Sequence, residues 1–331
     1  MYPRNKFLTI LLAAAAIALS SCGGAKLATA NEQMERGEYF DASRTYRKVY
    51  NKLTKREDRP LRGEVAYKIA ECHRRMNQFA QASAAYQNAA RYSYGDSVIY
   101  LRMAQMMAAE GKYPQAIKAY KDYLEWKPAD KLAQNGLIGA EMARDKKGAT
   151  RYVVKNAKLF NSRRSDFSPA YIDRSLDQLY FTSTNEKVTG TKKSEITGLK
   201  KGDIWFAGKD EQGRWKRPEP VEGELNSDAD EGAIAFSPDG STMYLSRARR
   251  EPNAQTGVEI YTSQRSDAKW SAPVKFEITS DTLSSYAHPA VSPDGQWLYF
   301  TSDMPGGYGG RDIWRINLKE SSGSLENLGE W

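Results

Sequence analysis

Two internal repeats with unrelated periods constrain the fold of this chain more than any other feature of its sequence. In the first half, a turn residue is followed two positions later by an aromatic residue, three positions after that by Ala, and four positions after that by Tyr. The pattern occurs at 37–46, 77–86 and 111–120, and the last two copies start 34 residues apart (111 − 77). Because Ala, Leu, Met and Tyr recur there with helical spacing, the repeat predicts an array of helix pairs.

This period and pattern resemble the tetratricopeptide repeat (TPR). The small side chains of Ala70, Ala82 and Ala104 are expected to let the two helices of a pair approach closely, and Tyr86 and Tyr120 to fill the gap to the next helix. The resemblance implies a solenoid that presents a concave surface to a peptide or protein partner.

An insertion and a proline predict where the connections and the end of the array lie. An insertion around Asn51–Arg59 lengthens the first connection, and Pro128 stands where the TPR family places a proline after its second helix. Lys131–Asp145 is expected to form a further leading helix, with Gly148–Phe160 as its partner or as a cap.

From about Asp166 the pattern changes to short strands of period two, separated by Gly, Asp, Asn and Ser. Each unit has a Phe-Ser-Pro or Ser-Pro-Asp-Gly word, an apolar strand, a strand that opens on an acidic residue, and in two units a tryptophan. The words are Phe167–Pro169, Phe236–Gly240 and Val291–Gly295; the strands are Gln178–Ser183, Thr242–Ser246 and Trp297–Ser302, then Asp203–Trp205, Glu259–Tyr261 and Asp312–Trp314; the tryptophans are Trp215 and Trp270. Units of 56 (259 − 203) and 53 (312 − 259) residues predict propeller blades.

These words resemble the PD40 repeat. Asp-Gly is expected to form a hairpin turn with positive φ, and the alternating aromatic residues to pack blade on blade. The chain ends on Trp331, where the earlier units have their tryptophan, so we expect two complete blades and most of a third, with further blades absent and an exposed edge. The loops at 185–202, 247–257 and 305–311 should emerge on one rim.

The first residues predict export. Residues 1–21 have a positive start and then an apolar stretch, Phe7–Leu19, as in a secretory signal peptide. The ending Leu19-Ser20-Ser21-Cys22-Gly23 resembles the bacterial lipobox, which implies lipidation of Cys22 and an anchor of several acyl chains. An ordinary signal peptide with an incidental cysteine is the alternative. Because no acidic run follows Cys22, we expect an outer-membrane lipoprotein that faces the periplasm.

The sequence predicts no catalytic, cofactor or metal site. His73 and Cys72 are neighbours on a predicted helix and point about 100° apart, which is poor chelating geometry. His288 precedes a proline in a blade strand and is interpreted as a packed or turn-bonding residue. Cys72 has no disulfide partner if Cys22 carries lipid.

Two further features are interpreted as structural. The carboxylates of Asp228, Asp230 and Glu231 lie in a predicted loop, where solvation or a turn role is expected. The glycine-rich loop Pro305–Arg311 lies between two strands and lacks the lysine of a phosphate-binding loop. The formal net charge of +8 is spread along the chain, so nucleic acid is not an expected partner.

The sequence therefore predicts an α + β multidomain protein: a signal peptide over 1–21, an all-α TPR solenoid over 22–160, and an incomplete all-β PD40 or WD40-like propeller over 166–331. This order resembles the OmpA-family lipoproteins of Bacteroidetes, including those of the type IX secretion system. The resemblance implies a non-enzymatic scaffold that links the secretion machinery to the cell envelope.

Its expected contacts are partner proteins, through the TPR groove and the propeller rim, and the membrane, through the lipid. Peptidoglycan would bind only a C-terminal OmpA-like domain that is missing here. Two alternatives stay open: a periplasmic peptide- or glycan-binding adaptor unrelated to secretion, and the TPR and propeller part of a truncated hydrolase.

Overall fold

A computed structural model describes residues 24–92, 94–145, 151–191, 193–249, 257–267, 269–320 and 324–329. Cys22 and Trp331 lie outside the described residues. The chain divides into two units, one of helices up to Val154 together with Glu195–Gly198, and one of strands that takes Lys155–Ser194 and the residues from Leu199 onward. The domain bounds drawn from the sequence remain predictions. No helix within these described ranges is long and apolar enough to cross a membrane.

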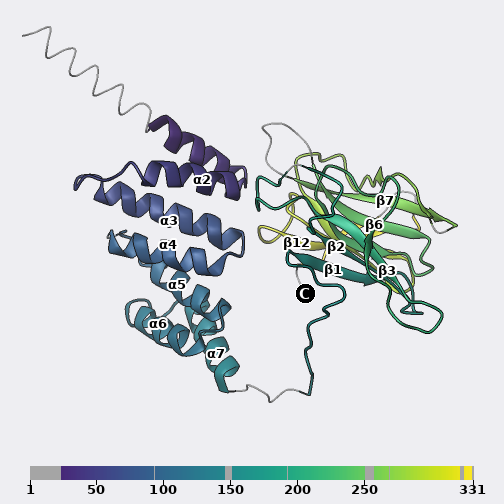
Figure 1. Cartoon of the computed structure of the whole chain (residues 1–331), viewed down its shortest axis with the longest axis horizontal. Coiled ribbons are helices and arrows are strands. Elements are labelled where there is room, and N and C mark those ends of the chain that lie inside the picture. The colour runs from purple at the N-terminus through teal and green to yellow at the C-terminus, as the bar shows by residue number, and fades with distance from the viewer. Residues whose placement is uncertain are drawn as a thin grey trace, which may run out of the picture. The chain divides into compact units, whose positions relative to one another are not determined.

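The first unit is a TPR solenoid in which each helix packs on the next along the chain (Figure 1). Its helices are a segment at 24–35, α2 (Tyr39–Tyr50), α3 (Arg59–Arg75), α4 (Phe79–Arg91), α5 (Val98–Ala109), α6 (Tyr113–Trp126) and α7 (Lys131–Asp145). The 51–58 segment between α2 and α3 is not helical, as the predicted insertion requires. The predicted helix Lys131–Asp145 is confirmed.

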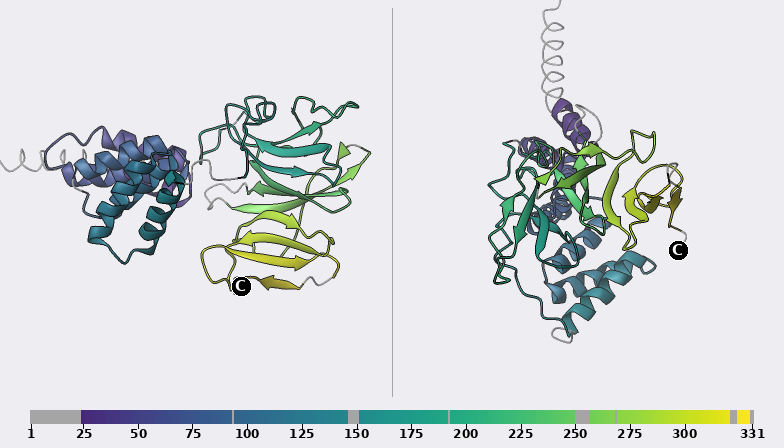
Figure 2. Two further views of the ribbon diagram at one scale, coloured as in Figure 1. Left: turned by 90° about the horizontal axis from the view of Figure 1, so that it is seen from below. Right: turned by 90° about the vertical axis from the view of Figure 1, so that its right-hand side faces the viewer.

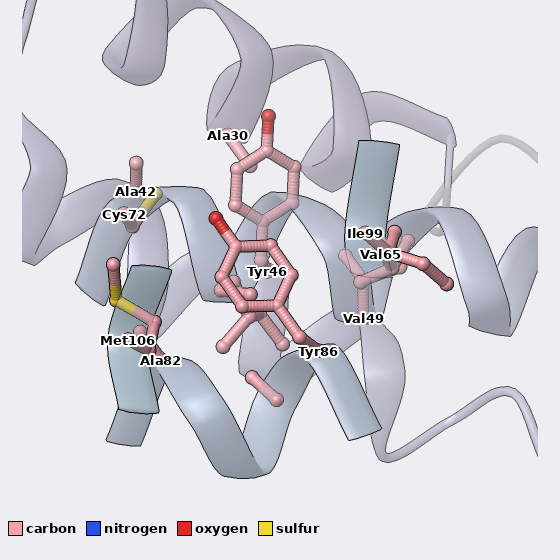
Figure 3. Packing of buried hydrophobic residues seen from close by; sticks show 13 residues of the cluster. Ala30, Ala42, Tyr46, Val49, Val65, Cys72, Ala82, Tyr86, Ile99 and Met106 are labelled. Carbon is pink, nitrogen blue, oxygen red and sulfur yellow. The ribbon is translucent and has the colours of Figure 1, made fainter. Parts of the chain in front are cut away.

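The small and aromatic positions of the repeat form the core. Ala70, Ala82 and Ala104 are fully buried, which confirms their role at close helix contacts. The rings of Tyr46 and Tyr86 lie within the same cluster (Figure 3). The Tyr46 hydroxyl donates to Asn31 Oδ1 at 2.6 Å, so its polar end is satisfied although the ring is buried.

The end of the array differs from the expectation. Residues 151–160 form turns and irregular chain, so a partner helix, one of the two alternatives predicted for Gly148–Phe160, is wrong for the part that the structure describes. Phe160 packs edge-to-face on Phe181 and Trp215, both in the second unit. The Phe160 ring therefore packs within the second unit. The helical spacing of apolar residues did not indicate this packing.

The second unit consists of three antiparallel sheets that lie side by side in chain order (Figure 2). The first has the order β1-β2-β3-β4, the second β5-β6-β7-β8 with β9 also paired to β7, and the third β10-β11-β12-β13. The strands are β1 (Asp166–Tyr171), β2 (Gln178–Ser183), β3 (Asp203–Gly208), β4 (Glu219–Pro220), β5 (Glu231–Phe236), β6 (Thr242–Ala248), β7 (Val258–Ser266), β8 (Lys269–Trp270), β9 (Val274–Lys275), β10 (Tyr286–Val291), β11 (Trp297–Ser302), β12 (Asp312–Asn317) and β13 (Leu325–Asn327).

These sheets are propeller blades because each buries a face against its neighbour. One cluster joins the first and second blades and includes Tyr180, Met243 and Trp270. The Trp270 Nε1 group donates to the Tyr180 hydroxyl at 3.2 Å. A second cluster joins the second and third blades through residues such as Tyr244 and Phe300. The predicted packing of aromatic residues between blades is confirmed.

One expectation about the blades is wrong. We expected most of a third blade, but the third sheet has a fourth strand, β13, and so has the full four strands. This outer strand is defined by its pairing with β12 and not by a tryptophan. Phe167–Pro169 precedes the apolar strand β2, as predicted; it lies inside β1, where the register shifts, whereas Ser237–Gly240 and Ser292–Gly295 are turns. Pro169 lacks an N–H group and is tolerated where the ladder is interrupted.

The two Ser-Pro-Asp-Gly turns have the predicted geometry. The amide of Gly240 donates to the Ser237 carbonyl at 2.8 Å, and the same bond in the third blade joins Gly295 to Ser292 at 2.9 Å. Gly240 and Gly295 have φ values of +70° and +66°, a conformation that a side chain disfavours.

A matched pair of glycines in α7 tests the helix packing. A Cβ atom at Gly136 would lie 2.5 Å from Cζ of the buried Tyr120, whereas one at Gly139 would meet nothing within 4 Å. We expect Gly136→Ala to lower the free energy of unfolding of the helical unit by about 1–3 kcal/mol through overpacking. Gly139→Ala should raise it by about 0.5–1 kcal/mol because glycine is a poor helix former. Urea unfolding followed by far-UV circular dichroism measures both, and equal effects would contradict the packing described.

Candidate functional site

The leading helices of the array carry a polar face. We call it the leading-helix face and define it by Tyr67, Lys68, Glu71 and Arg74 of α3 and Arg102 of α5. Glu71 stands three or four residues from each of Tyr67, Lys68 and Arg74, so these residues surround it on one side of α3.

Glu71 joins two repeats at the centre of this face. Its carboxylate accepts hydrogen bonds from Arg74 Nη2 at 2.6 Å and from the hydroxyl of Tyr86, and Arg102 Nε lies 3.6 Å away. Burial alone would raise the pKa of Glu71, but the hydrogen bonds from Arg74 and Tyr86 and the charge of Arg102 outweigh it and lower that pKa. The network therefore stays ionised and fixes both guanidinium groups.

Part of this face remains open to a ligand. The side chains of Arg74 and Arg102 keep 21% and 24% of their exposure. Lys68 is half-buried and takes part in no ion pair among the described residues. Tyr67 stacks on Tyr94 with 4.5 Å between ring centroids. Cationic groups held beside aromatic rings suit carboxylate and aromatic side chains of a peptide.

The propeller rim is the second surface. Strand register aligns Asp166, Ser183 and Asp203 at one end of the first blade. The same ends of successive blades meet. Between the first and second blades, Glu231 N donates to the Gly202 carbonyl at 2.9 Å; between the second and third, Arg249 Nη2 donates to the Ser284 carbonyl at 2.7 Å. The loops between second and third strands therefore emerge on one rim, as predicted; most of the 247–257 loop lies outside the described residues.

Acidic residues that open the third strands hold two of these loops in place. Asp203 Oδ2 accepts the amide of Thr189 at 2.5 Å. Asp312 Oδ2 accepts the amides of Tyr308 and Gly309 at 2.7 and 3.2 Å. The amides at the centre of the glycine-rich loop are thus used by the protein's own carboxylate, which agrees with its interpretation as a strand connection.

Glu231 was predicted to be a solvated or turn residue, and this is wrong. It is the first residue of β5 and is 1% exposed. Arg247 Nε lies 3.0 Å from its Oε1, and Ser227 Oγ donates to the same oxygen at 2.6 Å. Burial raises the pKa of Glu231 to about 7, helped by the nearby charge of Asp203, although Ser227 and Arg247 oppose the shift. Its position opposite Arg247 in the ladder, invisible without register, causes the burial.

The other residues singled out from the sequence are not brought together. His73 is buried, with Nδ1 2.7 Å from Gln78 Oε1, and burial lowers its pKa. Burial likewise raises the pKa of the Cys72 thiol to about 12. His288 lies in the bulge of β10 with its Nδ1 2.9 Å from Thr301 Oγ1. No group of three or more metal-binding side chains is found in the part of the chain that the structure describes.

The raised pKa of Glu231 predicts a pH-dependent stability. The folded state holds a proton on this carboxyl group up to about pH 7, whereas the unfolded chain releases it near pH 4.5. The stabilisation is therefore present below pH 4.5 and is lost as pH rises through 7. Between pH 5 and pH 8, Glu231→Gln should remove about 2 kcal/mol of this decline in the free energy of unfolding.

Urea titrations of the sheet unit, followed by tryptophan fluorescence, measure the slope. Glu224→Gln makes the same chemical change at an exposed position and should leave the slope as it is in the wild type. A Glu231→Gln protein with the wild-type slope would show that the carboxyl group does not titrate in this range.

No protein-family model matches the chain, and no curated protein matches it. Among solved structures, TolB from Acinetobacter baumannii is 20% identical over 51% of this chain and 33% of its own, with a TM-score of 0.32. The first TPR of Spaghetti (RPAP3), bound to an HSP90 peptide, is 22% identical over 37% and 92%, with a TM-score of 0.32. A thermostable family-43 glycoside hydrolase is 15% identical over 53% and 61%, with a TM-score of 0.32. The chain thus spans about a third of the TolB structure, and at these values the similarities assign no family.

Proposed function

We propose that this chain is a non-enzymatic scaffold, anchored in the outer membrane by lipid on Cys22, that binds partner proteins of a secretion machine and connects them to the cell envelope. The observation that carries the proposal is the leading-helix face. Two repeats share one buried ionic network there, which holds cationic groups at fixed positions beside aromatic rings.

The chemistry of this face favours a protein ligand. Glu71 is engaged by Arg74, Tyr86 and Arg102, so it is a positioning residue and is not free to react. What remains accessible is the outer part of the two guanidinium groups, the Lys68 ammonium group and the Tyr67 ring. These groups recognise carboxylates and aromatic side chains on an extended segment.

The propeller rim supports the same role. Its loops are tied down by carboxylates at Asp203 and Asp312, so they present fixed backbone to a partner at little entropic cost. A chain with two such surfaces can hold two proteins at once, and binding at one site raises the effective concentration at the other.

The specific setting rests on the sequence resemblance. The order of signal, TPR array and PD40 blades is similar to that of PorE, an OmpA-family lipoprotein of the type IX secretion system. We assign the envelope connection of this chain to its lipid and its partners.

Fractionation of a Bacteroidetes host with a type IX system tests the proposal. The wild-type chain should enter the membrane fraction and co-purify, after detergent extraction, with components of the secretion machine identified by mass spectrometry. Cys22→Ala should release the chain from the membrane. Lys68→Glu should keep the chain in the membrane but lower recovery of its partners by about tenfold, since it reverses a charge on the binding face.

Lys118→Glu is the control, because Lys118 is exposed on α6, away from the leading-helix face, where its contact is Asp122. It should retain both the membrane location and the partners. A Cys22→Ala chain that stays in the membrane would refute the anchor. Equal partner recovery from the Lys68 and Lys118 variants would refute the binding face.

A further inference from the structure

A hollow of about 300 Å³ lies on the TPR array between α2 and α4, the second helices of their pairs. We call it the trailing-helix hollow. Its walls come from the end of α2 and from α4, and Ala66, Ile69 and His73 of α3 also line it. These three residues are buried, so α3 forms the floor of the hollow. All the lining residues belong to the first unit.

The hollow lies on a different side of α3 from the leading-helix face. Ala66, Ile69 and His73 are three and four residues apart and form one stripe of the helix. Glu71, at the centre of the leading-helix face, is turned by about 140° from Ala66, since each residue of an α-helix turns by about 100°. A protein segment bound in the hollow therefore leaves the leading-helix face accessible.

Two small side chains leave this space open. Ala66 and Ala84 line the hollow, whereas the residues 34 positions later in the next repeat (100 − 66 and 118 − 84) are Tyr100 and Lys118. Alanine has no side-chain atoms beyond Cβ, so it cannot fill the volume that tyrosine or lysine occupies. The hollow is therefore specific to this repeat and is not a general property of the array.

A buried histidine holds an arginine at the hollow. His73 is 7% exposed, and its Nδ1 lies 2.7 Å from Gln78 Oε1. An amide oxygen accepts hydrogen bonds only, so Nδ1 carries the ring proton and Nε2 keeps a lone pair. Arg47 Nη2 lies 3.4 Å from Nε2 and donates to it. Because His73 and Arg47 both line the hollow, the Nε2 edge of the imidazole is directed toward it, and His73 is a positioning residue for the guanidinium.

The charge of Arg47 has no counter-ion within the described residues. Arg47 takes part in no ion pair there, and no acidic residue lines the hollow. The two wall helices, α2 and α4, together contain four basic residues and one acidic residue, whereas α6 contains two of each. The walls thus favour an anionic ligand.

Neither the arginine nor the histidine belongs to the repeated pattern. Their counterparts in the next repeat are Gln87 (87 − 47 = 40, as 77 − 37 = 40) and Met107 (107 − 73 = 34). A cation and the imidazole that orients it therefore occur together at the one position where the small alanines open a hollow. This coincidence points to a ligand and is not required by the packing of the helices.

Further donors lie beside the guanidinium. Asn51 and Asn88 line the hollow, and their side-chain amides form no hydrogen bond within the described residues. Arg47 uses one of its five N–H groups on His73 and keeps the others for a ligand. These donors surround a floor that includes Ala66 and Ile69, which suits the methylene groups of an acidic side chain.

We propose that the trailing-helix hollow binds the side-chain carboxylate of an Asp or Glu residue on a partner protein, with Arg47 as its counter-ion. An arginine and a carboxylate form a charge-assisted pair that is stronger than a neutral hydrogen bond. A volume of 300 Å³ equals that of about ten waters in the liquid, which holds one side chain and its adjoining backbone. The site goes beyond the proposed function, because it adds a second binding face to the array.

The imidazole of His73 reports binding in the full chain. The chain contains two histidines, so ¹³C labelling of histidine gives two sets of ring signals, and His288→Gln identifies those of His73. Titration with the blocked peptide acetyl-Ala-Glu-Ala-amide should shift the His73 signals saturably and leave the His288 signals unchanged. The same peptide with Gln in place of Glu keeps the shape and lacks the charge, so it should bind at least about tenfold more weakly.

Variants at the hollow test the role of the guanidinium and of the space itself. Arg47→Gln introduces the residue of the next repeat and should weaken binding of the Glu peptide by about tenfold to a hundredfold. Lys48→Gln is the matched control, because Lys48 is an exposed neighbour on α2 that does not line the hollow. It removes the same charge and should leave the affinity nearly unchanged. Ala84→Leu, at an exposed position, should weaken binding by filling the hollow without a change of charge.

Three results would overturn the proposal. The first is an equal shift of the His73 signals by the Glu and Gln peptides, and the second is an equal loss of affinity in Arg47→Gln and Lys48→Gln. The third is wild-type affinity in Ala84→Leu, which would place the carboxylate outside the hollow. Lys68→Glu alters the leading-helix face and should leave this titration unchanged, so failure of this site is distinguishable from failure of the proposed function.

Discussion

Stacking of each repeat on the next is the interaction on which both units depend. A pair of helices or a single four-stranded sheet cannot bury both of its apolar faces alone, so each repeat is stable only against a neighbour. In the array, Ala70, Ala82 and Ala104 are fully buried, which sets how closely helices approach and so where tyrosines fit. In the propeller, the aromatic clusters around Trp270 and Phe300 each draw on two sheets.

Local donors and charges determine the behaviour of two buried carboxylates. Glu71 and Glu231 are both buried next to an arginine, yet their pKa values move in opposite directions. Glu71 receives hydrogen bonds from Arg74 and Tyr86 as well as the charge of Arg102, and together these exceed the cost of burial. Glu231 has a hydrogen bond from Ser227 and the charge of Arg247, and it also lies near the negative charge of Asp203. The balance between hydrogen-bond donors, nearby charges and burial thus decides which buried acid is ionised.

Most of the fold could be predicted from sequence because the repeats impose two clear periods. Helix α7 and strands β2 and β11 were predicted with their observed bounds. The errors share a cause: the strand β13 and the burial of Glu231 both depend on pairing between strands, and a single sequence does not give register. The helical partner expected over Gly148–Phe160 failed because an apolar residue such as Phe160 does not reveal which unit it packs against. The sequence predicted the TPR groove and the propeller rim as candidate surfaces. It did not indicate the hydrogen-bond network of Glu71, because that network depends on contacts between helices.

The junction before the first blade shows how a repeat protein gains a surface that its repeat does not encode. Trp205 and Trp314 occupy the same place in two blades, and both have a buried indole N–H without an acceptor. Trp314 lies under Gly306 of a glycine-rich loop, whereas Trp205 lies beside a cleft closed by the segment before the first blade. That segment brings Lys158 and the ring of Phe160, and neither belongs to the repeated pattern. The buried indole is therefore a property of the blade, and the cleft beside it is a property of the junction. Comparing equivalent positions between blades isolates this difference in the surroundings of the two tryptophans. A search for repeated motifs along the chain would miss it.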